Sequence, residues 1–205
     1  MTENALISAL ALQKIGNIGD ITAKKLIHHC GSVEAVFSEK KTALLKIDGI
    51  GDYYLRDLHN KAHFKAAEQE LRFIKKHNII CHYFLEELYP EKLKHCIDGP
   101  ILLFQRGNIN LRNHHIISIV GTRKITNYGV DFCQSIVEAL APYNPIIVSG
   151  FAYGTDITAQ KAALNTSDAF PYIRIGSSIR SIPDFHLGWH LIVLPSLERR
   201  NRPFI

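Results

Sequence analysis

The chain has 205 residues, of which 46% are hydrophobic and 21% charged, a composition typical of soluble globular proteins. Its formal net charge of +5 favours an anionic partner without identifying one. The longest apolar runs are much shorter than the roughly 20 residues of a membrane-spanning helix, and the first residues show no secretion signal. We therefore expect a cytoplasmic protein that does not enter a membrane.

The four cysteines are scattered, and no two of them have the CxxC spacing of a zinc site. The histidines also lack metal-ligand spacing, because His28-His29 and His114-His115 are adjacent pairs that point in different directions. The sequence therefore predicts reduced thiols, no metal and no cofactor.

Two short stretches near the start, residues 15–27 and 47–58, share the sequence Ile-Gly-Asp. Each predicts two short helices joined by a tight turn, because glycine tolerates positive φ and lets the backbone approach a partner closely. Asp20 and Asp52 are expected to cap the second helix of each pair. The stretches resemble the helix-hairpin-helix module, whose backbone amides contact DNA phosphates. A small helical packing domain without DNA contact is the alternative.

Residues 61–78 have apolar residues at helical spacing, including Phe64, Ala67, Leu71 and Ile74, with charges on the remaining positions. They predict an amphipathic connecting helix. The residues before it, 1–60, are predicted to form a small all-α, helix-hairpin-helix-like (SAM-like) domain.

The central region alternates apolar strands with helices. Strands are predicted at 79–84, 101–104, 114–120 and 145–150, and helices at 127–143 and 154–164. Continuous apolar strands separated by helices favour an α/β fold with a parallel sheet covered on both faces. We therefore expect a Rossmann-like domain over residues 79–166.

Two predicted strands end in glycine turns, "SIVGTRKITNYG" at 118–129 and "PIIVSGFAYGTD" at 145–156. Ligands of parallel sheets collect at the carboxyl ends of the strands, where helix N-termini present free amides to anions. In the first turn, Gly121 allows close approach, Thr122 offers a hydroxyl, Arg123 a planar fork for phosphate and Lys124 a point charge. Neither turn has the GxGxxG or P-loop pattern, so a dehydrogenase or an NTPase is not supported.

In the second turn, Ser149 and Gly150 could accept another phosphate or a sugar. Tyr153 is open to two interpretations, since an aromatic after a strand can stack on a base or simply pack. Asp156 is expected to cap the following helix.

The stretch "IVGTRKITNYG" followed by "IIVSGFAYGTDITAQKAAL" resembles the DNA-processing protein A family (DprA/Smf). The residues that match its second motif are Ser149, Gly150, Ala152, Gly154, Asp156, Ala159, Ala163 and Leu164. Gln160 stands where the family usually has histidine. The segment "YPEKLKHCIDGPILLFQRGN" is also similar to the family, and the resemblance covers about residues 5 to 166.

The resemblance implies a Rossmann-like protein that binds single-stranded DNA, protects incoming DNA in natural transformation and helps to load the RecA recombinase. It implies a protein that usually dimerises and has no catalytic activity. The DNA or phosphate site carried over by position consists of Gly121, Thr122, Arg123, Ser149, Gly150 and Gly154, with Lys124 and Tyr153 beside it.

From Ser167 onward the sequence no longer follows the family, so residues 167–205 are predicted to be a divergent tail and the sheet to be incomplete at its C-terminus. A truncated or frameshifted gene would produce such a tail. Two alternatives stay open: a nucleotide-processing enzyme of a related Rossmann-like fold, similar to the phosphoribohydrolases, and a non-functional fragment.

Overall fold

The structure is a computed structural model, which describes residues 1–106, 115–150, 152–166, 172–176 and 190–193. The chain forms two compact units, with the boundary between Leu103 and Phe104. The sequence instead predicted that the α/β domain begins at residue 79, so the first strand and the segment after it lie on the other side of the observed boundary. Each unit is described by itself below.

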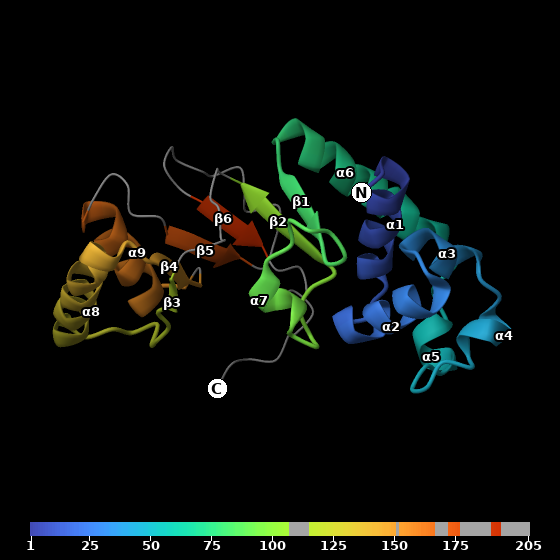
Figure 1. Ribbon diagram of the computed structural model, residues 1–205, viewed down its shortest axis with the longest axis horizontal. Helices are drawn as coiled ribbons and strands as arrows, with labels where there is room; N and C mark the ends of the chain where they lie inside the picture. Colours follow the sequence, from blue (N-terminus) through green and yellow to red (C-terminus); the bar gives the residue numbers. More distant parts are fainter. Residues whose placement is uncertain (107–114, 151, 167–171, 177–189, 194–205) are drawn as a thin grey trace. The chain divides into compact units, whose positions relative to one another are not determined.

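The first unit begins with helices, as the sequence predicted (Figure 1). They are α1 (Glu3–Lys14), α2 (Asp20–Cys30), α3 (Val33–Ser38), α4 (Lys41–Leu44), α5 (Asp52–Leu55) and α6 (Lys61–Lys76). The two copies of the Ile-Gly-Asp repeat lie in helix-to-helix turns: the first copy joins α1 to α2, and the second joins α4 to α5. A hydrogen bond of 3.0 Å from the Asn17 side-chain amide to the Tyr53 carbonyl links the first turn to the start of α5.

Helix α6 is the predicted amphipathic helix and packs along α1. Its buried positions include Ala67, Leu71 and Ile74, which fall on one face because they recur at helical spacing. Glu70 is buried on the same helix, and its carboxylate is paired with Lys14 Nζ of α1 at 3.2 Å. The pair supplies the partner that a buried charge requires.

The expected capping by Asp20 and Asp52 is wrong. The cap positions are Gly19 and Gly51, so each aspartate is the first residue of its helix and not its cap. The Asp20 carboxylate instead accepts a hydrogen bond of 3.0 Å from the backbone amide of Ile101, a residue distant in sequence. Its negative charge in the first turn still suits the positive end of the helix dipole.

After the helices, the first unit continues through β1 (Ile80–Tyr83) and α7 (Glu91–Lys94) to the start of β2 (Leu102–Arg106). Tyr89 is fully buried, and its hydroxyl donates a 2.6 Å hydrogen bond to the carbonyl of Pro100. Burial is the main cause that raises the pKa of Tyr89. The bond fixes the loop between α7 and β2.

The second unit contains the rest of β2 and the predicted alternation of strands and helices. Its elements are β3 (Ile116–Ser118), α8 (Asn127–Leu140), a short 3-10 turn (Ala141–Tyr143), β4 (Ile146–Ser149), α9 (Thr155–Thr166), β5 (Tyr172–Gly176) and β6 (His190–Val193). The strand order in this unit is β2-β6-β5-β4-β3. Strands β3, β4, β5 and β6 are parallel to one another, whereas β2 is antiparallel to β6. The sheet is therefore mixed rather than wholly parallel.

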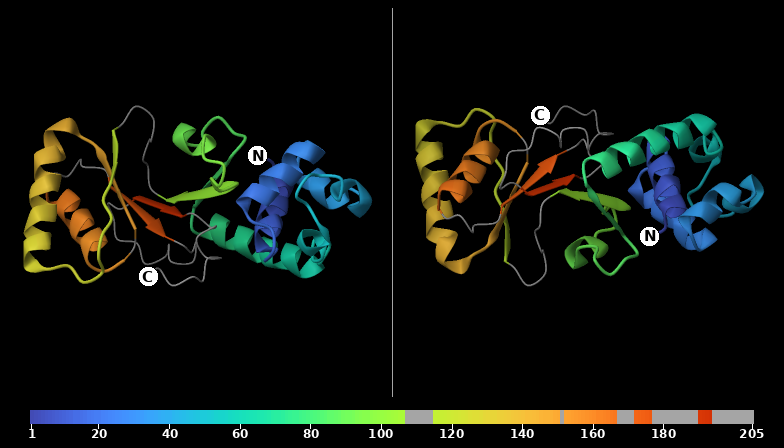
Figure 2. Two further views of the ribbon diagram at one scale, coloured as in Figure 1. Left: turned by 90° about the horizontal axis from the view of Figure 1, so that it is seen from below. Right: turned by 90° about the horizontal axis from the view of Figure 1, so that it is seen from above.

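Helices α8 and α9 lie side by side on one face of β3 and β4 (Figure 2). Their core includes Cys133 and Val137 of α8, Ile147 of β4, and Ala159 and Ala163 of α9. The sequence predicted helices on both faces. Because β3, β4 and β5 are adjacent in sequential order, right-handed crossovers place both helices on the same face.

Strands β5 and β6 fall within residues 167–205, which the sequence analysis predicted to be a divergent tail. β5 pairs with β4 over residues 172–174, with Val148 opposite Ile173. The predicted tail therefore contributes two strands to the sheet. Its remaining residues, including the basic Arg-Arg-Asn-Arg run, lie outside the described residues.

Candidate functional site

The candidate site lies where β3 and β4 end. Because the two strands are parallel, with Ile117 opposite Ile147, their carboxyl ends reach the same edge of the sheet. The amide of Ile119 donates to the Val148 carbonyl at 2.9 Å, and Ser149 Oγ donates to the Ile119 carbonyl at 2.6 Å. Ser149 is buried. Its hydroxyl ties the two strand ends together and does not face the solvent.

The two predicted glycine turns meet. The amide of Thr155 donates to the Thr122 carbonyl at 3.1 Å, and the Thr155 hydroxyl donates to the same oxygen at 3.3 Å. Gly154 has φ +85°, and a Cβ at this position would collide with the Thr122 carbonyl oxygen. A Cβ on Gly121 would lie 2.5 Å from Thr155 Oγ1. Glycine is therefore required on both sides of the contact, because any side chain would push the turns apart.

The first turn presents its cations to the solvent. Arg123 and Lys124 are both exposed, and within the described part of the chain neither forms an ion pair. The Thr122 hydroxyl accepts a hydrogen bond of 3.1 Å from the Lys124 amide, which fixes the backbone between them. Two cations on a fixed turn suit an anionic ligand, and the guanidinium suits a phosphate in particular.

Each of the two turn stretches contains an exposed tyrosine, Tyr128 in the first and Tyr153 in the second. Tyr153 is 82% exposed, so the interpretation that it packs into the protein does not hold within the described residues. Tyr128, in the first turn of α8, is 77% exposed and stacks on Phe132, with ring centroids 6.1 Å apart and planes 14° apart. This pair was not predicted from the sequence. Its signal was two aromatics four residues apart, away from the buried stripe of the helix.

The second turn differs in charge from the first. Asp156 is buried, and a Cβ on Gly150 would lie 2.6 Å from its carboxylate. The Gln160 side-chain amide donates to the Gly150 carbonyl at 2.9 Å, while Gln160 Oε1 is buried and has no partner among the described residues. A carboxylate this close disfavours a phosphate at Gly150. The donors for an anion therefore lie on the Gly121–Lys124 side.

No group of three or more His, Cys, Asp and Glu side chains among the described residues could hold a metal ion. No helix in that part of the chain is both long and apolar enough to cross a bilayer.

The chain matches known proteins over these turns. The family model for "DNA recombination-mediator protein A" matches residues 80–182. The match continues beyond Thr166, so the prediction that the family pattern stops there is wrong up to residue 182. The short run that forms β5 lies in this added stretch. It was not predicted because the surrounding Ser, Pro and Arg residues are typical of a loop or tail.

Two curated relatives agree with the family model. The DNA processing protein DprA of Streptococcus pneumoniae is 35% identical over 80 residues, which cover 39% of this chain and 28% of that protein. Protein Smf of Borreliella burgdorferi is 30% identical over 119 residues, which cover 57% of this chain and 38% of that protein. The matched stretch thus spans well under half the length of either relative.

A solved structure shows the same fold. The X-ray structure of DNA processing protein A (DprA) from Streptococcus pneumoniae superposes with a TM-score of 0.60 at 21% identity, covering 94% of this chain and 67% of that one. The family model, which matches half of the chain, and the similar fold of this solved structure agree with each other. The chain belongs to the DNA recombination-mediator protein A family, whose curated relatives carry the names DprA and Smf.

Proposed function

We propose that the second unit binds single-stranded DNA at the turn formed by Gly121, Thr122, Arg123 and Lys124. In this proposal Ser149, bonded to the Ile119 carbonyl, and Gly154, packed against Thr122, hold that turn in place. The observation that carries the proposal is the contact between the two glycine turns, which places two exposed cations on a fixed backbone. A phosphodiester chain supplies the anions that such cations bind.

The exposed aromatics support a single strand over a duplex. Proteins that bind single strands combine a basic groove with rings on which unpaired bases stack, each worth about 1–3 kcal/mol. Tyr153 lies within the second turn, between Gly150 and Gly154, and Tyr128 follows the first turn at the start of α8. In a duplex the bases are already stacked on one another and would not be available to these rings.

The wider role that we propose is the one implied by the family: the protein protects incoming DNA and helps to load RecA during natural transformation. The proposal includes a dimer acting in the cytoplasm, without catalysis, and it takes the second unit as Rossmann-like and the first as helix-hairpin-helix-like. Membership of a family described as recombination mediators supports this role. Assembly of RecA on single-stranded DNA, with and without the protein, tests it directly.

The DNA site is tested with a fluorescently labelled, unstructured oligonucleotide whose anisotropy reports binding. Arg123→Ala should weaken binding about tenfold, or roughly 1–2 kcal/mol, as expected for one charged phosphate contact. Arg72→Ala is the matched control, because Arg72 is an exposed arginine on α6 of the first unit that forms no ion pair among the described residues. Equal affinities of the two variants would remove Arg123 from the site.

A further inference from the structure

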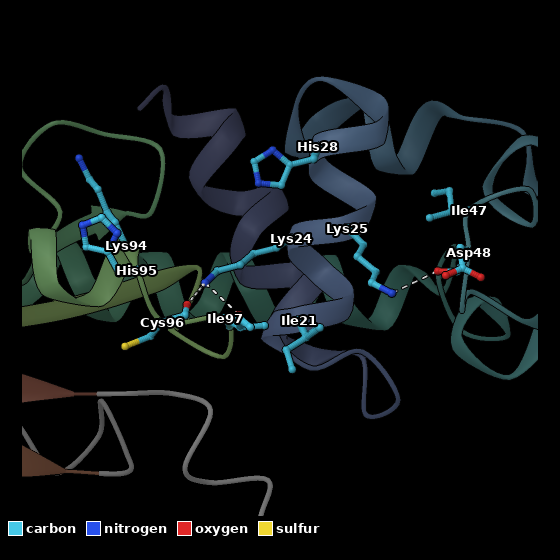
Figure 3. A pocket seen from close by; sticks show the side chains of 10 residues that line it. All are labelled: Ile21, Lys24, Lys25, His28, Ile47, Asp48, Lys94, His95, Cys96 and Ile97. Carbon is cyan, nitrogen blue, oxygen red and sulfur yellow. Dashed lines mark hydrogen bonds between the residues drawn. The ribbon is translucent and has the colours of Figure 1, made fainter.

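The first unit has a pocket of its own, of about 610 Å³, that the proposed function does not use. Its walls are α2, the turn at Ile47–Asp48 and residues 94–97 at the end of α7 (Figure 3). The side chains of Lys24, Lys25 and His28 line it from α2, and Lys94 and His95 line it from the opposite side.

Backbone carbonyls, not carboxylates, hold the two lysines of α2. Lys24 Nζ donates to the carbonyls of Cys96 and Ile97, at 3.0 and 3.3 Å. Lys25 Nζ donates to the backbone carbonyl of Asp48 at 3.2 Å. An ammonium group has three N–H donors, so one remains on Lys24 and two remain on Lys25. Both charges are positioned but not neutralised.

Positive charge predominates around the pocket. Neither Lys24 nor Lys25 takes part in an ion pair within the described residues, and Asp48 is the one acidic residue among those that line the pocket. Glu91 approaches Lys94 at 3.7 Å and His95 at 3.5 Å, but these are exposed pairs with little net energy. The fixed lysines therefore make the electrostatic potential of the pocket positive.

Two backbone features keep the lysines where they are. Gly49, with φ +77°, forms the turn that presents the Asp48 carbonyl, and a Cβ there would lie 3.3 Å from Lys25 Nζ. At Gly99, a Cβ would lie 3.1 Å from the Cys96 carbonyl that holds Lys24. The second copy of the glycine repeat thus positions a cation of α2.

The pocket also exposes apolar surface beside these cations. Ile21 is 46% exposed and Ile97 is 78% exposed, and both are lining residues. A ligand that suits this surface carries negative charges and flat apolar groups close together. A nucleic-acid strand has this chemistry, because its phosphates suit the lysines and its bases present flat, largely apolar faces.

We propose that this pocket is a second nucleic-acid site, which binds the phosphate backbone of a single strand through Lys24, Lys25 and Lys94. It is built separately from the glycine turns of the second unit. The choice of a nucleic acid over an acidic peptide rests on the proposed function. The site itself rests on the pocket and its fixed cations.

The chain has a natural reporter for this site. Cys96 lines the pocket and is exposed, whereas Cys133 is buried and burial raises the pKa of Cys81 to about 12. A thiol reagent at neutral pH should therefore modify Cys96 faster than Cys81 or Cys133, since the thiolate is the reactive form. The rate at Cys96, followed by peptide mass spectrometry on the full chain, reads occupancy of the pocket directly.

Saturating single-stranded oligonucleotide should slow the modification of Cys96 at least fivefold, while inorganic phosphate at the same phosphate concentration should not. The double variant Lys25→Gln/Lys94→Gln should lose this protection and bind the oligonucleotide about tenfold more weakly, as two charged contacts are removed. Lys61→Gln/Lys65→Gln is the control, because it removes the same charge from exposed positions on α6 that do not line the pocket. Both double variants are first checked for an unchanged unfolding midpoint.

The outcomes separate this site from that of the second unit. Arg123→Ala should leave the protection of Cys96 by saturating oligonucleotide intact, even though its affinity falls. Protection in the wild type and in Lys61→Gln/Lys65→Gln, but not in Lys25→Gln/Lys94→Gln, supports the second site. An unchanged Cys96 rate in saturating oligonucleotide overturns it, whatever happens at Arg123. Protection by an acidic peptide and not by the oligonucleotide also overturns it. Equal protection by inorganic phosphate would show a simple anion pocket and overturn the strand proposal.

Discussion

The two units present positive charge to their surroundings in different ways. In the second unit, the backbone is fixed and the cations are free: glycines bring the turns into contact, and Arg123 and Lys124 extend into solvent. In the first unit, the cations themselves are fixed, because carbonyl oxygens hold the ammonium groups of Lys24 and Lys25. The site of the second unit depends on glycines, which have no side chain. The site of the first unit depends on the lysine side chains themselves.

The two sites should therefore tolerate different substitutions. A turn built from glycines should be damaged by any added Cβ, even one that carries no charge, because atoms of the facing turn occupy the space: the Thr155 side chain at Gly121 and the Thr122 and Arg123 backbone at Gly154. A pocket built from lysines should tolerate small changes in shape but not the loss of charge.

Gly154→Ala should have the largest effect. The added Cβ would meet the Thr122 carbonyl, and φ +85° is unfavourable for alanine, so we expect a loss of about 3 kcal/mol in stability. Urea unfolding measures the loss. Gly16→Ala is the control, since a Cβ at Gly16 would meet nothing within 4 Å. Equal midpoints for the two variants would show that the turns do not touch as described.

Gly99→Ala tests the same principle in the first unit. Its Cβ would lie 2.6 Å from the Leu93 carbonyl, but the glycine does not have positive φ, so the cost is steric alone. We expect about 2 kcal/mol from the same urea titration. The variant should also displace the Cys96 carbonyl that holds Lys24. A cost as large as that of Gly154→Ala would remove the distinction between strained and merely crowded glycines.

Tyr89→Phe should cost about 1 kcal/mol, because the buried Pro100 carbonyl would lose its hydrogen bond while the ring stays in place. Thermal unfolding at fixed protein concentration measures the change. Tyr54→Phe on α5 is a suitable control, since no hydrogen bond of its hydroxyl occurs among the described residues. A loss above about 3 kcal/mol would mean that the hydroxyl supports more than one loop.

The smallest effect concerns salt. Removing the Arg123 charge should lower the slope of log affinity against log salt by about 0.7, the value for one phosphate contact with a single strand. The double variant Lys25→Gln/Lys94→Gln should lower it by about twice as much. Titrations at four salt concentrations decide between these values. Unchanged slopes would show that neither site contacts phosphate directly.

Much of the second unit could be predicted from the sequence. The apolar runs predicted strands β3 and β4, and the apolar stripe of residues 127–143 predicted α8, whose Cys133 and Val137 are buried against β4 and α9. The meeting of the glycine turns followed from the parallel alternation. The exposure of Tyr153 could not be predicted, since a lone aromatic after a strand is equally consistent with packing.

Three features lay beyond the reach of sequence patterns. β5 and β6 are short strands in a stretch whose composition suggests a tail, and only their pairing identifies them. The antiparallel direction of β2 depends on the course of the chain in space, which periodicity does not report. The pocket of the first unit brings α2 next to residues more than 70 positions further along the chain, and no local motif marks such a contact.

The double hydrogen bond from Thr155 to the Thr122 carbonyl has a mechanical consequence. If DNA binds at Arg123 as proposed, tension on the DNA would pass through Thr122 into the first turn of α9 as well as along β3. The load is therefore shared between a helix and a strand instead of bending a free loop. Loss of the Thr155 hydrogen bonds would let the first turn move under tension and release the DNA, although every group that contacts the DNA would still be present.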